Sequence, residues 1–250
     1  VYFSLQFFTL QKMTVLDFGP IYTPTGNIAQ IDYAQKNADN GSTCIALKNN
    51  NGVLIAIEKP IDSNLYIISE DKRIKKLTRN CVIAGTGLLS DMIFFNSLVQ
   101  RDLIGLQRQT ASLPANTVKK VISMHSSEFT RYYGCRPLGV NMLSAVNDFG
   151  TYTLYVTDTS SKTREVRGYA IGKGAARAKT ELEKIDIEEL SHKRMIDNAV
   201  RILYKCFDPL KDKPFEVEIG ILDKNGYREV PQEEYAEFVE AYKDLNVDDD

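Results

Sequence analysis

Short runs of β-branched and other apolar residues fall into two groups along the chain, and stretches of helical periodicity follow each group. Residues 42–48 and 53–58 are β-rich and flank the turn 49–52 (NNNG), where an Asn-Gly step favours a tight hairpin. Residues 215–221 alternate between apolar and polar positions, which is the period of a half-buried strand. The other expected strands are 81–84, 139–146, 151–157, 165–171 and 227–230.

Apolar residues recur every three or four positions in five other stretches, which predicts amphipathic helices. These stretches are 88–106, 118–129, 175–184, 193–207 and 233–245. Ser191 is placed to be the N-cap of the fourth helix. Two groups of strands with helices after each indicate two sheets packed face to face, with helices outside both. The chain has no Gly/Ser/Pro-rich linker and no internal repeat, so we expect one α+β domain.

The first twelve residues (VYFSLQFFTLQK) are apolar and aromatic, and Met13 follows them directly. No basic residue precedes the apolar stretch and no small-residue cleavage site follows it, so the segment does not match a secretory signal peptide. We expect residues 1–12 to be an extension or disordered arm before a natural start at Met13, with an ordered apolar arm as the alternative. No apolar run reaches the roughly 18–20 residues that a membrane-spanning helix needs.

Composition narrows the function classes. The 250 residues are 43% hydrophobic and 26% charged, with a mean hydropathy of −0.26, which is typical of a globular protein. The 31 Lys and Arg against 33 Asp and Glu give a net charge of −2, which argues against nucleic-acid binding through overall positive charge. The four cysteines lie far apart and there are two histidines, so we expect a reducing compartment and no disulfide framework, metal site or cofactor.

Several candidates for chemistry have a plainer structural explanation. His125 lies on the apolar face of an expected helix and His192 lies beside an expected N-cap, so we expect structural roles for both. Residues 170–174 (AIGKG) lack the phosphate-binding spacings GxxxxGK[ST] and GxGxxG and favour a strand-to-helix corner. Residues 229–250 hold nine acidic residues and one basic residue, which predicts an acidic helix ending in a solubilising tail, 246–250.

A basic run is the one charge cluster with two open interpretations. Five cations fall within eight residues: Lys72, Arg73, Lys75, Lys76 and Arg79. A solvated strand face is the plainer interpretation. A docking site for a carboxylate, such as the C-terminus of a partner, is the functional alternative.

Several local strings together resemble the proteasome α-type subunits. Residues 22–26 (YTPTG) and 28–34 (IAQIDYA) are similar to the family pattern F-S-P-x-G-R-x-F-Q-V-E-Y-A. Residues 87–91 (GLLSD) and 136–140 (RPLGV) are similar to its G-L-x-x-D and R-P-[FY]-G-V motifs. Residues 170–184 (AIGKGAARAKTELEK) match the A-I-G-x-x-x-x-x-A-K-T-E-[IL]-E-K pattern of the seventh α class, also called α type-3.

The resemblance implies a four-layer αββα sandwich of the N-terminal-nucleophile hydrolase type. It divides the chain into a gate segment (13–26), one αββα domain (27–245) and the acidic tail (246–250). The protein would be a structural subunit of the outer ring of the 20S core particle, in ubiquitin-dependent protein degradation in the cytoplasm and nucleus. Its partners would be neighbouring α subunits, β subunits and the regulatory ATPase particle or other activators, and neither nucleic acid nor a membrane.

The resemblance implies that the chain has no catalytic residue. Catalytic members of the fold use a processed N-terminal threonine, whereas Ser42, nearest to that position, has 41 residues before it. The catalytic Asp position falls on Glu58 and the catalytic Lys position on Ile74, which cannot shuttle a proton. Two alternatives stay open: an active hydrolase whose processing exposes Ser42 or Thr43, and a ring-forming scaffold outside the proteasome.

The segment before the first strand would form a helix over the cleft that β subunits leave open. This helix is expected over 26–38. Its expected packing residues are Ile28, Ile31, Tyr33 and Ala34.

The residues before that helix would form the axial gate. The family stabilises an open gate with a Tyr-Asp pair, a Pro and a Tyr. Pro24 and Tyr33 match the last two, and Gly26 matches the glycine of the turn. An ungapped alignment puts residues 15–16 (VL) at the Tyr-Asp pair, whereas a shift of one residue brings Asp17 there.

The resemblance also places an activator-docking pocket at the basic run. In the family, a lysine before the fourth short strand receives the terminal carboxylate of an activator tail. An ungapped count places this position on Arg73, and one deletion places it on Lys72. Arg73 is therefore the first candidate and Lys72 the second.

Overall fold

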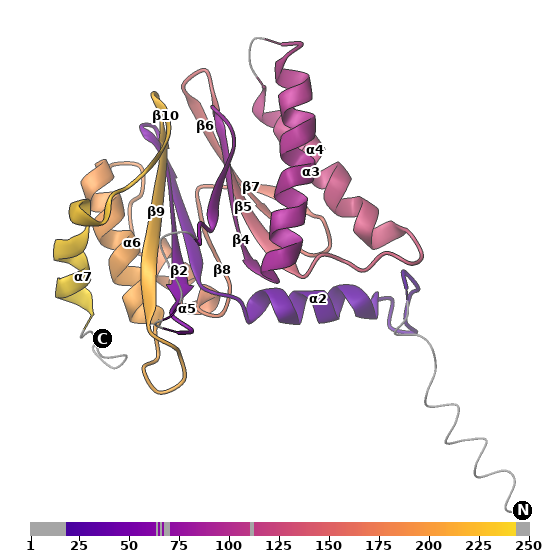
Figure 1. The fold of residues 1–250 in the computed structure, drawn as a ribbon, viewed down its shortest axis with the longest axis horizontal. Helices are drawn as coiled ribbons and strands as arrows, with labels where there is room; N and C mark the ends of the chain where they lie inside the picture. The colour runs from indigo at the N-terminus through magenta and orange to yellow at the C-terminus, as the bar shows by residue number, and fades with distance from the viewer. Residues whose placement is uncertain (1–18, 64, 66, 68–70, 111–112, 244–250) are drawn as a thin grey trace, which may run out of the picture.

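Two five-stranded antiparallel sheets form the centre of the molecule (Figure 1). The structure, a computed structural model, describes residues 19–63, 65, 67, 71–110 and 113–243. Sheet A has the order β10-β9-β2-β1-β8 and sheet B the order β3-β4-β5-β6-β7. The strands of sheet A are β1 (Cys44–Asn49), β2 (Gly52–Pro60), β8 (Gly168–Ile171), β9 (Phe215–Asp223) and β10 (Gly226–Glu229). Those of sheet B are β3 (Ile74–Thr78), β4 (Cys81–Gly87), β5 (Val140–Asp148), β6 (Thr151–Thr157) and β7 (Thr163–Val166).

Helices cover the outer face of each sheet (Figure 1). Helices α3 and α4 pack on sheet B through a cluster centred on Phe95 and Ile122. Helices α5, α6 and α7 pack on sheet A through a cluster centred on Leu54 and Leu203. The helices are α2 (Ala29–Asp39), α3 (Leu89–Gln107), α4 (Ala115–Arg131), α5 (Ala175–Glu183), α6 (His192–Cys206), η3 (Gln232–Glu234) and α7 (Ala236–Tyr242). A third apolar cluster fills the space between the sheets, so the predicted four-layer αββα sandwich is confirmed.

Local sequence explains most of these elements. The Asn49 side chain accepts hydrogen bonds from the N–H groups of Asn51 and Gly52 and so closes the predicted hairpin. The Ser191 hydroxyl accepts a bond from the N–H of Arg194, which confirms the predicted N-cap of α6. Gly172 has a φ of +89°, and a Cβ there would lie 2.1 Å from the Ser42 carbonyl oxygen, so the AIGKG corner needs a glycine.

Two expected elements are divided in the structure. The stretch 165–171 is not one strand, because the chain leaves sheet B after β7 and joins sheet A as β8. Ile187 packs against Gly168 at the start of β8, where a Cβ would lie 2.9 Å from its side chain. The expected helix 233–245 is divided by Tyr235, whose φ of −128° separates η3 from α7.

Helix α2 lies across one end of the two sheets (Figure 1) and contacts β4 and β5. It begins at Ala29 rather than residue 26, and the Asn37 side chain donates a hydrogen bond to the Gly139 carbonyl at 2.9 Å. Of the four expected packing residues, Ala34 is buried and Ile28 and Ile31 are partly buried, whereas Tyr33 is 46% exposed and does not pack within the single chain. The predictions for 1–12, for Val15, Leu16 and Asp17, and for the tail 246–250 lie outside the described residues. In the part of the chain that is described, no helix is long and apolar enough to cross a membrane.

Candidate functional site

A cavity of about 380 Å³ opens where the residues before β3 face strands β9 and β10. Charged side chains of both signs line it: Lys59, Lys72, Glu216, Glu218 and Glu229. The rest of its wall consists of Val217, Ile219, Val230, Pro231, Gln232 and Tyr235. The cavity can therefore hold a ligand that presents an anion, a cation or both.

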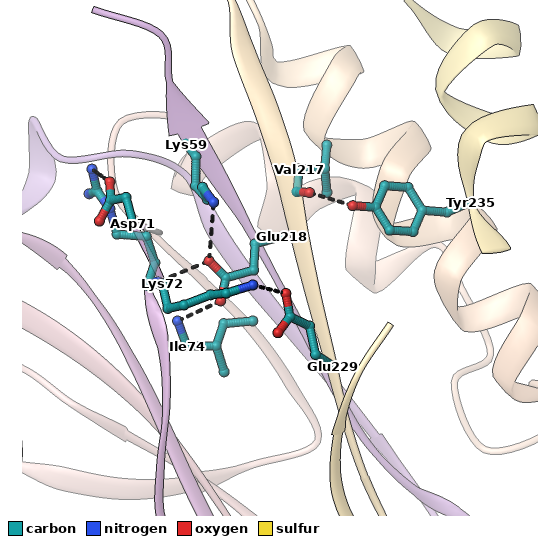
Figure 2. A network of polar contacts seen from close by, with 9 residues as sticks. Lys59, Asp71, Lys72, Ile74, Val217, Glu218, Glu229 and Tyr235 are labelled. Atoms are coloured by element: carbon teal, nitrogen blue, oxygen red, sulfur yellow. Dashed lines mark hydrogen bonds and ion pairs between the residues drawn. The ribbon is translucent and has the colours of Figure 1, made fainter. Parts of the chain in front are cut away.

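Glu218, one of the residues that line this cavity, joins the two sheets (Figure 2). Its side chain is only 4% exposed, and its two oxygens accept the N–H groups of Arg73 at 2.9 Å and Ile74 at 3.0 Å. The Lys59 ammonium lies 4.0 Å from the same carboxylate. Burial raises the pKa of Glu218 above its ordinary value, and the two N–H groups and Lys59 oppose that rise. The backbone around Lys72 is therefore fixed to sheet A.

The two predicted docking residues point to different partners. The Lys72 side chain is 39% exposed, lines the cavity and forms an ion pair with Glu229 of β10 (Figure 2). The Arg73 side chain is 19% exposed, and its Nε donates a hydrogen bond to Asp71 Oδ2 at 2.8 Å. The structure thus places Lys72, and not Arg73, among the residues that line the cavity.

The predicted gate residues are only partly brought together. The N–H of Gly26 donates to the Thr23 carbonyl at 2.9 Å, which closes a turn with Pro24 at its second position. A Pro at the second position and a Gly at the fourth are the residues that such a turn favours. Gly26 also has a φ of +82°. Tyr33 lies apart from this turn on α2, where Lys36 lies over its ring at 5.6 Å.

The residues at the hydrolase-like position, Glu58 and Ile74, lie in different surroundings. Glu58 is completely buried, accepts the N–H of Thr43 at 3.1 Å and lies 3.7 Å from the Lys173 ammonium. Burial raises its pKa, which Lys173 and the Thr43 bond oppose. Ile74 belongs to the cluster between the sheets together with Ile57. Because neighbouring residues of a strand face opposite sides, Glu58 points away from that cluster.

Sequence reasoning missed the cation beside Glu58. Lys173 also forms an ion pair with Asp212 at 2.9 Å, so its ammonium is shared by two carboxylates. The AIGKG string contains this lysine, but nothing in the local pattern indicates its partners. Across the described ranges, no group of three or more His, Cys, Asp and Glu side chains is placed to hold a metal ion.

Comparison with known proteins identifies the family. A family profile described as "Proteasome subunit" matches residues 38–222. The chain is 39% identical to a probable proteasome subunit alpha type-7 of Encephalitozoon cuniculi, over 95% of this chain and 100% of that protein. It is 30% identical to a proteasome subunit alpha type-3 of Acanthamoeba castellanii, over 92% of this chain and 95% of that protein. It is also 30% identical to a probable proteasome subunit alpha type-7 of Schizosaccharomyces pombe, over 92% of each. The chain therefore belongs to the proteasome subunit family and is one of its α-type members.

Proposed function

We propose that this α-type subunit is a non-catalytic component of the outer ring. The observation that carries the proposal is helix α2, which precedes β1 and is bound across the end of the sandwich instead of leaving a free N-terminus at Ser42. A buried Ile74 in place of a lysine supports it, because a hydrocarbon side chain cannot accept a proton.

Peptide hydrolysis tests this part of the proposal. The purified chain should hydrolyse no peptide substrate. Turnover that Ser42→Ala or Thr43→Ala abolishes would contradict the proposal and support the alternative of an active N-terminal-nucleophile hydrolase.

The turn at Pro24 and Gly26 would contribute to the axial gate. Its support is the closed turn itself, which fixes the direction of the chain just before α2. Tyr22 and Tyr33 are 70% and 46% exposed in the single chain, which leaves aromatic surface for a neighbouring subunit. Replacing Pro24 and Gly26 together by Ala should change the basal peptidase activity of the assembled core while the core still assembles. Unchanged basal activity in a fully assembled core would contradict this role.

The cavity at Lys72 would receive the terminal carboxylate of a regulatory particle or another activator. Its support is the position of the Lys72 ammonium in the cavity and the fixed backbone beneath it. A hydrogen bond to a charged group contributes roughly 1.5–3 kcal/mol, so Lys72→Glu should weaken activator binding at least about tenfold.

Two control variants sharpen this test. Lys76→Glu makes the same charge change four residues along, at an exposed residue outside the cavity, and should leave activator binding nearly unchanged. Arg73→Glu tests the first sequence candidate. Unchanged activator affinity at low salt in both Lys72→Glu and Arg73→Glu would show that the basic run is a solvated face.

The location of the assembled particle is a further part of the proposal. We expect it in the cytoplasm and the nucleus, where it would take part in ubiquitin-dependent degradation. Imaging of the chain with a fluorescent tag tests this. A signal confined to another compartment would contradict it and would favour a ring scaffold outside the proteasome.

A further inference from the structure

The Lys72 ammonium is not an unoccupied anchor for a carboxylate. It already forms an ion pair with Glu229, which lies at the end of β10 and lines the same cavity. A carboxylate that enters the cavity must share this lysine with Glu229 or displace it. In either case the incoming anion lies close to a second anion, and like charges at short distance repel.

The other charges of the cavity increase this repulsion of an incoming carboxylate. The second lysine, Lys59, lies beside the buried Glu218 and is itself only 5% exposed. Glu216 is opposite Lys59 in the pairing of β2 with β9, and it is exposed at the rim. Two lysines and three glutamates line the cavity, so an anionic ligand without any cation adds to an existing excess of carboxylates.

From these contacts we propose that the cavity selects a C-terminal peptide tail that carries two charges of opposite sign. The terminal carboxylate pairs with Lys72, and a lysine or arginine side chain within the last three residues pairs with Glu229. Successive residues of an extended chain are about 3.3 Å apart, and lysine and arginine side chains are long. A lysine or arginine close to the bound terminal carboxylate can therefore reach Glu229, which contacts Lys72. This inference rests on the docking function proposed for the same cavity.

The test measures peptide binding to the assembled core particle that contains this chain. The probes are synthetic eight-residue peptides with a photo-crosslinking group at the N-terminus. They carry lysine, alanine or glutamate at each of the last three positions in turn, and they end in a carboxylate or in an amide. The quantity compared is the peptide concentration that gives half-maximal cross-linking to this chain, which isolates its cavity from those of other subunits.

In the wild-type particle, the best lysine peptide should need at least about threefold less peptide than the alanine peptide, and the glutamate peptide should need more. The amide forms should bind more weakly than the carboxylate forms. Glu229→Gln should abolish the preference for lysine and improve binding of the alanine peptide, because the carboxylate of Glu229 no longer competes with the peptide carboxylate for Lys72. Glu233→Gln, an exposed charge outside the cavity, should retain the wild-type preference.

The outcomes separate this inference from the docking function. Cross-linking that depends on the terminal carboxylate and on Lys72, but is equal for lysine and alanine peptides, would overturn the inference and leave the docking function standing. Cross-linking that is equal for the carboxylate and amide peptides, and is unchanged in Lys72→Gln, would overturn the docking function and the inference together. A lysine preference that persists in Glu229→Gln would overturn the assignment of Glu229 as the cation partner.

Discussion

Two buried glutamates lie on neighbouring strands of sheet A, and their surroundings differ. Glu58 of β2 is paired in register with Val217, next to Glu218 of β9. Glu58 accepts one backbone N–H, from Thr43 just before β1 of the same sheet, and its Oε1 has no hydrogen-bond partner among the described residues. Glu218 accepts two N–H groups, one on each oxygen, from Arg73 just before β3 and from Ile74, the first residue of β3 in the other sheet. Two buried carboxylates can therefore have different roles, because each role depends on which groups the carboxylate connects.

The two glutamates also differ in the parts of the molecule that their contacts join. The contacts of Glu58 are local to one end of sheet A and to the corner at Lys173. Those of Glu218 join the two sheets and fix the backbone that carries Lys72. We propose that Glu218 positions the backbone at Lys72 for the proposed docking function, and that Glu58 is a structural residue.

We expect Glu218→Ala to cause the largest loss of unfolding free energy. It leaves two buried N–H groups and Lys59 without their carboxylate, and breaking a buried charge pair in this way costs about 3–5 kcal/mol of unfolding free energy. Urea unfolding of the purified chain, followed by circular dichroism, measures this loss. Glu216→Ala on the same strand is the control and should change the value by less than about 0.5 kcal/mol. A loss below about 1 kcal/mol for Glu218→Ala would show that its hydrogen bonds between the sheets contribute little to stability.

Glu58→Ala should cost less, about 1–3 kcal/mol, because only one N–H loses its acceptor and Lys173 keeps Asp212 as a partner. The same urea titration gives the value. Equal losses for Glu58→Ala and Glu218→Ala would remove the distinction between the two glutamates.

The pH dependence of stability should show both buried carboxyls. Burial raises the pKa of Glu58 and of Glu218 above the ordinary value of 4.5, so the folded state holds their protons more tightly than the unfolded chain does. This contribution to stability is present below pH 4.5 and is lost as the pH rises through the raised values. The difference in unfolding free energy between the wild type and each of the variants Glu58→Gln and Glu218→Gln should therefore shift against the wild type as the pH rises from 4.5 to 7. An advantage that grows over this range would reverse the sign of the predicted shift.

The smallest expected effect is that of Lys173→Met. The Lys173 side chain is 29% exposed, and ion pairs with access to water contribute about 0–1 kcal/mol. Lys59→Met should cost more, because the Lys59 side chain is 6% exposed beside an equally buried partner. Thermal unfolding of the two variants side by side gives their order, and the reverse order would count against the comparison.

The sequence predicts the layers of this fold well because the signals for helices and hairpins are local. Helical spacing identified α3 and α4, and the Asn-Gly steps marked the tight turns. The division of 165–171 between two sheets could not be predicted, since periodicity does not say which sheet a strand joins. The resemblance implied that Tyr33 is a packing residue of the helix, but within the single chain α2 turns smaller residues such as Ala34 and Ala38 toward the sheets.

The candidate site was harder to predict because its contacts cross long distances in the chain. The polar positions at 216 and 218 indicated a solvated strand face. Glu218 is instead buried and accepts the backbone N–H of Ile74, which lies 144 residues earlier in the chain. Counting along the basic run could not choose between Lys72 and Arg73. The structure separates them, because Lys72 lines the cavity whereas Arg73 pairs with Asp71. Glu229 was counted only as part of an acidic segment, and no local pattern indicates its pairing with Lys72.

Mass spectrometry of the native complex that contains this chain, with the intact mass of the released chain, tests the central claim most directly. We predict a complex of proteasome α and β subunits in which the chain still carries the residues that precede Ser42, including helix α2. A chain that begins at Ser42 or Thr43, or a ring without other proteasome subunits, would contradict the account.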